Sequence, residues 1–287
     1  TQELYEGLIA SGQNAFPSVS FDVGAVNNYL SRFFSAGFYY KTFIGIPPFE
    51  WGSGTKTWMI FEKFIRKAAG MGKASKLPDP DSYEHAHDHC DLLIIGSGPA
   101  GVAAALEAAE NKLDVILVEQ DSILGGDQLA ESDFDFKSNY DELKNLGVRI
   151  MNRTTAFGLY DNCVVGLLER ITDHIGEKNK NLPRQRFWTI RAKHVLIGSG
   201  ALERHISFNN NDIPGIMTVN ASKHYLNRYG VLTGQDIVIT TNNDSSYQTA
   251  QLLFQAGAKV TVLDARKEIN LEEDILDNIQ VRFGTVP

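Results

Sequence analysis

Short apolar runs alternate with a helical pattern in the middle of the chain. Residues 92–95 are a continuous apolar run, which predicts a buried strand. An alanine-rich stretch over 102–110 predicts a helix, and a second apolar run at 115–118 predicts another strand. A strand, a helix and a strand in this order indicate a βαβ unit, and therefore an α/β fold with a parallel sheet.

The turn between the first strand and the helix reads Gly-Ser-Gly-Pro-Ala-Gly over residues 96–101, a G-x-G-x-x-G pattern. The first glycine permits a tight turn, the second lets a pyrophosphate approach the backbone, and the third lets the helix pack closely on the strand. Free N–H groups at the helix N-terminus favour phosphate. This context predicts dinucleotide binding, although the glycines could instead form only a tight turn in a degenerate unit. The candidate cofactor-binding residues of this turn are Gly96, Gly98, Pro99 and Gly101.

An acid follows the second predicted strand. The carboxylate of Glu119 suits a hydrogen bond from a ribose 2′-hydroxyl and repels a 2′-phosphate, so NAD or FAD is favoured over NADP. Gly125 and Gly126 come soon after, which fits a loop folding over the adenosine side of a dinucleotide. Two adjacent glycines are equally consistent with a plain turn, and Gly126 is therefore a candidate residue rather than an assigned one.

The pattern then changes to shorter, more polar elements. A helix is predicted over 136–146 and a strand over 148–151. Strands over 154–160, 164–170 and 187–191 predict a small antiparallel meander. A further apolar strand over 194–200 ends in Gly-Ser-Gly and returns the chain to the cofactor edge of the sheet.

Residues 235–266 repeat the opening pattern, with strands over 236–240 and 260–263 and a helix over 247–256. At the position of the glycine turn this repeat has Thr-Asn-Asn-Asp-Ser-Ser, and side chains such as Asp244 would crowd and repel a pyrophosphate. We therefore expect a second, degenerate Rossmann unit that binds no ordinary dinucleotide.

The N-terminal part is richer in aromatic residues, which gather over 33–43. We expect this cluster to pack on the main domain, with an exposed interface as the alternative. An amphipathic helix is predicted over 59–69. The expected organisation is an aromatic-rich segment with linker (1–88), a first dinucleotide-binding domain (89–205) and an incomplete second Rossmann-like unit (206–287).

Three alternating histidines, His85, His87 and His89, precede Cys90. They could bind a metal on a strand edge, but no other residues complete a typical ligand spacing, so we predict a solvated lead-in to the first strand and no metal. Cys90 and Cys163 form no disulfide framework, which favours a reducing, cytoplasmic setting.

Composition excludes several classes of function. The net charge of −8 argues against a nucleic-acid partner and against an anionic membrane surface. No apolar run reaches the roughly 18 residues of a transmembrane helix, and the first residues lack the pattern of a signal peptide. The first residue is Thr1, so we expect a processed chain or an excised piece.

Four stretches of the chain are distinctive beyond the glycine turn itself. They are AGFYYKTF (36–43), AAGMGK (68–73), PDPDSYEHAHDHCDLLIIGSGPAG (78–101) and TTAFGLYD (154–161). On these stretches the chain resembles the α subunit of heterotetrameric sarcosine oxidase, within the two-dinucleotide-binding-domain flavoproteins. The absence of a C-x-x-C pair argues against a disulfide reductase.

This resemblance implies NAD in the first unit, where most related folds hold FAD. It also implies FMN at the α/β interface, FAD in the β subunit where the amine is oxidised, and γ and δ subunits as further partners. Ala100 would lie near the pyrophosphate and Ala156 would line the same site. The resemblance also implies that Gln120, Asp121 and Asp127 are cofactor-binding residues. Of these, Gln120 and Asp121 would contact the adenosine ribose together with Glu119.

The resemblance also implies an activity for the intact complex. It would oxidatively demethylate sarcosine to glycine with O2, giving H2O2 and 5,10-methylenetetrahydrofolate from tetrahydrofolate. Family α subunits carry further domains that do not fit in 287 residues, so we expect an incomplete, inactive copy with no catalytic residue and a structural or regulatory NAD. Two alternatives remain. One is the α subunit of a proline, opine or cyanide-forming glycine dehydrogenase, and the other is a non-catalytic interaction subunit.

Overall fold

The computed structural model describes residues 6–8, 17–18, 20–29, 59, 62–63, 66, 76–131, 136–175, 181–209, 211, 215–268 and 279–286. The chain divides into two compact parts, residues 1–81 with 174–177 and residues 82–173 with 178–287. The first part contains the short helices η1 (Val23–Ala25) and α1 (Val26–Tyr29). The aromatic cluster at 33–43 and most of the helix predicted over 59–69 lie outside the described residues.

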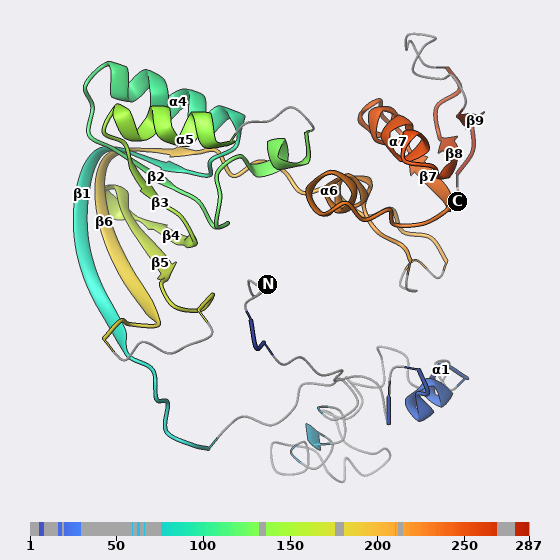
Figure 1. Cartoon of the computed structure of the whole chain (residues 1–287), viewed down its shortest axis with the longest axis horizontal. Helices are drawn as coiled ribbons and strands as arrows, with labels where there is room; N and C mark the ends of the chain where they lie inside the picture. The colour runs from blue at the N-terminus through green and yellow to red at the C-terminus, as the bar shows by residue number, and fades with distance from the viewer. Residues whose placement is uncertain are drawn as a thin grey trace, which may run out of the picture. The chain divides into compact units, whose positions relative to one another are not determined.

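The second part begins with a six-stranded mixed sheet in the order β3-β2-β1-β6-β5-β4 (Figure 1). The strands β1, β2, β3 and β6 run parallel, while β4 and β5 are antiparallel to their neighbours, as the predicted meander requires. The α/β fold class is therefore confirmed. The bounds are β1 (Tyr83–Ile95), β2 (Val115–Val118), β3 (Arg149–Met151), β4 (Thr154–Tyr160), β5 (Val164–Arg170) and β6 (Gln185–Ile197).

Two predictions about strand length were wrong. β6 is one continuous strand of 13 residues in place of two separate ones. β1 also has 13 residues, because it pairs with β6 from Tyr83 opposite Gln185 to Ile95 opposite Ile197. The run from His85 to His89 is therefore part of the strand and not a lead-in to it. All three histidines are exposed there.

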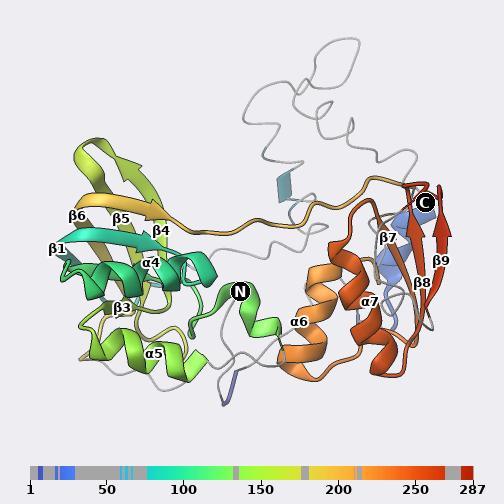
Figure 2. The ribbon, with the colours of Figure 1, turned by 90° about the horizontal axis from the view of Figure 1, so that it is seen from above.

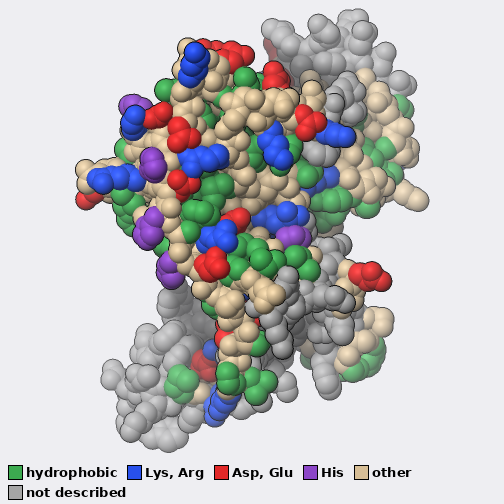
Figure 3. Space-filling model, turned by 60° about the vertical axis from the view of Figure 1, so that its left-hand side comes forward, with side chains coloured by type: hydrophobic (Ala, Val, Ile, Leu, Met, Phe, Trp, Pro, Cys, Tyr) green, Lys and Arg blue, Asp and Glu red, His purple; other side chains and the backbone are tan. Residues whose placement is uncertain are grey.

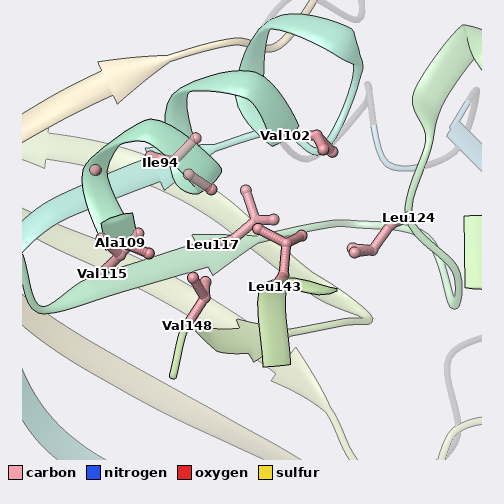
Figure 4. Close-up of a cluster of buried hydrophobic side chains, with 10 residues drawn as sticks. Ile94, Val102, Ala109, Val115, Leu117, Leu124, Leu143 and Val148 are labelled. Atoms are coloured by element: carbon pink, nitrogen blue, oxygen red, sulfur yellow. The ribbon is translucent and has the colours of Figure 1, made fainter. Parts of the chain in front are cut away.

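Helices α4 (Pro99–Glu110) and α5 (Phe136–Asn145) cover one face of this sheet (Figures 1 and 2). Side chains alternate along each strand, so Leu117 of β2 faces the helices while Ile116 faces away from them. Both faces of β2 are therefore buried, which explains its continuous apolar run. The cluster under the helices includes Ile94, Val102, Leu117, Leu124 and Leu143 (Figure 4).

A second βαβ unit follows, as predicted, with a parallel sheet in the order β7-β8-β9. Its elements are β7 (Asp236–Thr241), α7 (Ser245–Gln255), β8 (Lys259–Asp264) and β9 (Gln280–Phe283). The core of this unit forms around Tyr247, Leu253 and Val262.

Helix α6 (Val219–Tyr229) was not predicted, although its ends carry recognisable signals. The hydroxyl of Thr218 accepts a hydrogen bond from the N–H of Ala221, and Gly230 ends the helix in the left-handed conformation. Three short 3₁₀ turns complete the described elements, of which η2 (Gly126–Ala130) and η3 (Asp161–Cys163) lie in the second part. Among the described helices, none has the length and apolar character needed to cross a membrane.

Candidate functional site

The glycine turn after β1 has a shape that only glycine permits at two of its positions. Gly96 has a φ of +100°, and a Cβ atom there would overlap the carbonyl oxygen of Gly198 at the end of β6. A Cβ atom on Gly101 would overlap the carbonyl oxygen of Gly96. The first and third glycines therefore pack the turn against α4 and β6, as the motif predicts.

Gly98 differs from both, because a Cβ atom there would have nothing within 4 Å. It is the N-cap residue of α4, and no described side chain caps the helix at this point. Pro99 and Ala100 in the first helical turn are exposed. The turn therefore presents open space beside the positive end of the helix dipole, which suits an anionic group.

Glu119 lies buried beneath this turn, with 7% of its surface exposed. Its Oε2 atom accepts hydrogen bonds from the backbone N–H of Ser97, at 3.0 Å, and from the Ser97 hydroxyl. Its Oε1 atom accepts one from the N–H of Asp121 at 2.8 Å. An ionised carboxylate offers about four acceptor positions, so these three bonds leave one for a ligand hydroxyl.

Ser97 was not predicted as a candidate residue. It lies in the glycine turn and bonds both to Glu119 and to the loop that contains Gly125. It is fully buried, and its hydroxyl and carbonyl oxygens each accept a hydrogen bond from the N–H of Gly125, both at 3.1 Å. Gly126 follows with a φ of +55°, and a Cβ atom there would lie 3.3 Å from the Cα of Gly98. The Gly-Gly pair therefore folds back against the glycine turn.

The remaining candidate residues have different surroundings. Gln120 is exposed, and its carbonyl oxygen accepts a hydrogen bond from Arg170. Asp121 pairs with Arg228, at 3.3 Å, and Asp127 lies in η2 beside α6. Ala156 lies in β4 and packs against the buried cluster on the face of the sheet opposite the helices. The glycine turn, Glu119 and the Gly-Gly loop are thus brought together directly, whereas Ala156 contributes to the core.

In the second unit, the acid at the end of the second strand has a cationic partner within the same unit. Asp264 ends β8 as Glu119 follows β2, and it is fully buried. Arg266 donates to it through its guanidinium group and its backbone N–H, both at 2.8 Å, and also pairs with Asp244 at 2.7 Å. The hydrogen bonds from Arg266 lower the pKa of Asp264 to about 2. Burial and the bond to Asp264, at 2.7 Å, raise the pKa of Tyr247.

Charged side chains of both signs are interspersed over the face shown in Figure 3.

Within the described ranges no group of three or more His, Cys, Asp or Glu residues could hold a metal ion. Both cysteines are free thiols, and burial raises the pKa of Cys90 to about 11.

The order of these features can be compared with known proteins. Residues 90–283 match the pyridine nucleotide-disulphide oxidoreductase family, which covers both βαβ units. The chain belongs to this oxidoreductase family. Membership supports the binding of a flavin or nicotinamide nucleotide and agrees with the open glycine turn of the first unit.

Several individual proteins are similar to this chain in sequence or structure. The sarcosine oxidase alpha subunit of Rhizobium meliloti (strain 1021) is 46% identical over 92% of this chain and 27% of its own length. An opine oxidase subunit of the same strain is 25% identical over 59% of this chain and 37% of its own length. Among solved structures, L-proline dehydrogenase from P. horikoshii gives a TM-score of 0.49 at 26% identity, over 66% of this chain and 38% of its own.

The resemblance to sarcosine oxidase α subunits is thereby confirmed, and it extends over nearly the whole chain. This oxidoreductase-family chain spans about a quarter of the length of that relative. The two proteins from R. meliloti are both named as subunits, so these relatives act as parts of larger complexes.

Proposed function

We propose that the first βαβ unit binds a dinucleotide, with NAD preferred, at the turn formed by residues 96–101. The observation that carries this proposal is the contrast among the three glycines of the turn. Two are required by packing, whereas Gly98 has open space around it and no packing reason to be glycine. A pyrophosphate that approaches the backbone supplies such a reason.

The residues around the turn would divide the work of binding. Gly98, Pro99 and Ala100 would border the pyrophosphate at the N-terminus of α4. Glu119 would accept a hydrogen bond from the adenosine ribose through its remaining acceptor position, and a 2′-phosphate would meet its buried charge. Gln120, Asp121, Gly126 and Asp127 would border the adenosine side, and Ala156 would support it from β4. When bound, NAD can exchange a hydride at its nicotinamide ring.

A single methyl group tests this proposal. Gly98 has an extended backbone (φ −67°, ψ −177°), so Gly98→Ala leaves the fold intact and places a Cβ atom where the pyrophosphate would lie. We expect the wild-type chain to bind NAD by calorimetry, and the variant to bind at least about tenfold more weakly, because close approach is lost.

The melting temperature without ligand is the control and should fall by only a few degrees in the variant, because alanine is a poorer N-cap residue than glycine. NAD bound equally well by the Gly98→Ala variant would contradict the proposal. Titrations with FAD and NADP in parallel show which dinucleotide the site prefers.

At the level of the whole complex, we propose that the chain is the nucleotide-binding part of a sarcosine oxidase α subunit. Identity of 46% over 92% of the chain supports this. The complex would contain β, γ and δ subunits, with FMN at the α/β interface and FAD in β. It would convert sarcosine and O2 to glycine and H2O2 and pass the one-carbon unit to tetrahydrofolate. The chain alone would be inactive.

Co-expression with a β subunit tests this second level. We expect sarcosine-dependent peroxide from the assembled complex and none from the chain alone, because amine oxidation would take place on β. Activity only toward other amines would contradict the substrate assignment and leave nucleotide binding untouched.

The similarity to an opine oxidase subunit favours one alternative, the α subunit of a related amine dehydrogenase. In that case FAD would occupy the first site. The absorbance spectrum of the cofactor extracted from the purified protein separates the two, because a flavin absorbs visible blue light and NAD does not.

A further inference from the structure

Helix α6, which packs on the core of the second βαβ unit, contacts the loop that follows β2. This loop, residues 120–131, is called the adenosine loop below. Helix α6 lies beside η2 of this loop (Figures 1 and 2). Five side chains of α6 each make a hydrogen bond or ion pair to a loop residue. They are Asn220 to Asp127 (3.3 Å), Lys223 to Glu131, His224 to Asp127 (3.4 Å), Asn227 to the carbonyl oxygen of Ala130, and Arg228 to Asp121 (3.3 Å).

These five residues share one face of the helix, because positions three, four, seven and eight residues apart lie on the same side. Their charges complement the loop, since Lys223 and Arg228 are basic and Asp121 and Glu131 are acidic. The Lys223 and Arg228 side chains are 14% and 23% exposed, so both are largely covered where they meet the loop.

The other side of α6 is fixed to the second unit. Val219 and Leu226 pack against the core around Tyr247. The hydroxyl groups of Ser222 and Thr233 lie 2.6 Å apart and share a hydrogen bond. Helix α6 is thus anchored on one side and contacts the adenosine loop with the other.

The contacts continue from α6 to the centre of the predicted site. Arg228 holds the carboxylate of Asp121, and the N–H of Asp121 donates to Glu119 at 2.8 Å. Glu119 accepts from Ser97, whose hydroxyl accepts from the N–H of Gly125. A displacement of α6 therefore bears on the loop that carries Gly125 and on the acid that faces the ribose.

We propose that α6 is a positioning element for the first nucleotide site, and that Lys223, Asn227 and Arg228 are its positioning residues. This inference rests on the proposed function. The side chains on α6 hold the adenosine loop in its binding conformation, so the docking of α6 and the binding of dinucleotide stabilise each other. Coupling of this kind is reciprocal, and the dinucleotide strengthens the attachment of the second unit to the loop.

Reversing one charge and then restoring the pair tests the proposal. Lys223→Glu places two carboxylates face to face, and we expect the dissociation constant for NAD to rise about three- to tenfold. Adding Glu131→Lys restores the opposite-charge pair, and the double variant should return to within about twofold of wild type. Neither residue is expected to contact the nucleotide. Lys259→Glu, the same change at an exposed position on β8, should leave the constant unchanged.

A second measurement separates positioning from simple stability. Hydrogen exchange of the α6 backbone amides should slow when NAD is added to the wild-type chain, and should not respond in Gly98→Ala. The coupling is contradicted if Lys223→Glu leaves the dissociation constant for NAD unchanged and if NAD does not slow hydrogen exchange in α6. NAD binding by the wild-type chain would still support the proposed function in that case. Failure of Glu131→Lys to rescue also counts against the coupling. If the wild-type chain binds neither NAD nor FAD, both proposals are contradicted.

Discussion

At the scale of single residues, Glu119 and Asp264 occupy equivalent positions in the two βαβ units but have different hydrogen-bond partners. Each acid lies at the end of the second strand of a βαβ unit, and each is buried. Glu119 is held by one serine side chain and two backbone N–H groups, which leaves acceptor capacity. Asp264 is held by the guanidinium group of Arg266 and the hydroxyl of Tyr247. The second acid therefore already has a cationic partner in the folded chain.

The pairing of Asp264 predicts a dependence of stability on pH. Its pKa falls from an ordinary 3.8 to about 2 in the folded chain, so its contribution is complete above pH 4 and is lost as the pH falls toward 2. The free energy of unfolding should fall by about 2 kcal/mol over this range. Urea unfolding at pH 6 and pH 3 should show about 1 kcal/mol of this loss, because pH 3 lies between the two pKa values.

Asp264→Asn provides the control for this prediction. The variant lacks the titrating group, so its deficit relative to wild type should be largest at pH 6 and smaller at pH 3. A deficit of equal size at both pH values would show that the carboxylate charge contributes nothing.

At the scale of elements, strands that are marked by a local apolar run were predictable. Strand segments that form only by pairing with a distant strand were not. The bounds of β2 agree with its apolar run, because both faces are covered. The first half of β1 carries exposed histidine and glutamate side chains and becomes a strand by pairing with β6. The first half of β6 was predicted over 187–191, but its continuity with the following strand segment was not. Helix α6 escaped prediction because its loop-facing side is polar, so its apolar periodicity is weak.

The packing of α4 on β1 predicts opposite outcomes for the same substitution at two glycines of the turn. Gly101→Ala places a Cβ atom against the carbonyl oxygen of Gly96, so the helix or the turn must shift. We expect a loss of about 2 kcal/mol or more in the free energy of unfolding, as for other overpacked positions. Gly98→Ala, measured by the same thermal unfolding, should cause little change. Equal losses in both variants would contradict this account of the turn.

At the scale of the whole chain, the first βαβ unit was predictable because its glycine turn stands between an apolar strand and a helix. The family was predictable because stretches outside that turn also resemble sarcosine oxidase α subunits. Interactions between distant residues could not be predicted. Ser97 is a variable position of the motif, and its bonds to Glu119 and Gly125 exist only in the folded chain. The same is true of Arg228 and Asp121, which are 107 residues apart in the sequence. The sequence therefore did not predict the contact between α6 and the adenosine loop.

The contact of Gly96 with Gly198 has a consequence for ligand affinity. The turn packs between the ends of β1 and β6. Ser97 forms hydrogen bonds with Glu119, which follows β2, and with Gly125 of the adenosine loop. The backbone of the turn is thus preorganised by three strand ends, and a ligand need not freeze it. Most of the conformational entropy lost at this site was already lost when the sheet formed, so more of the contact energy is available for affinity.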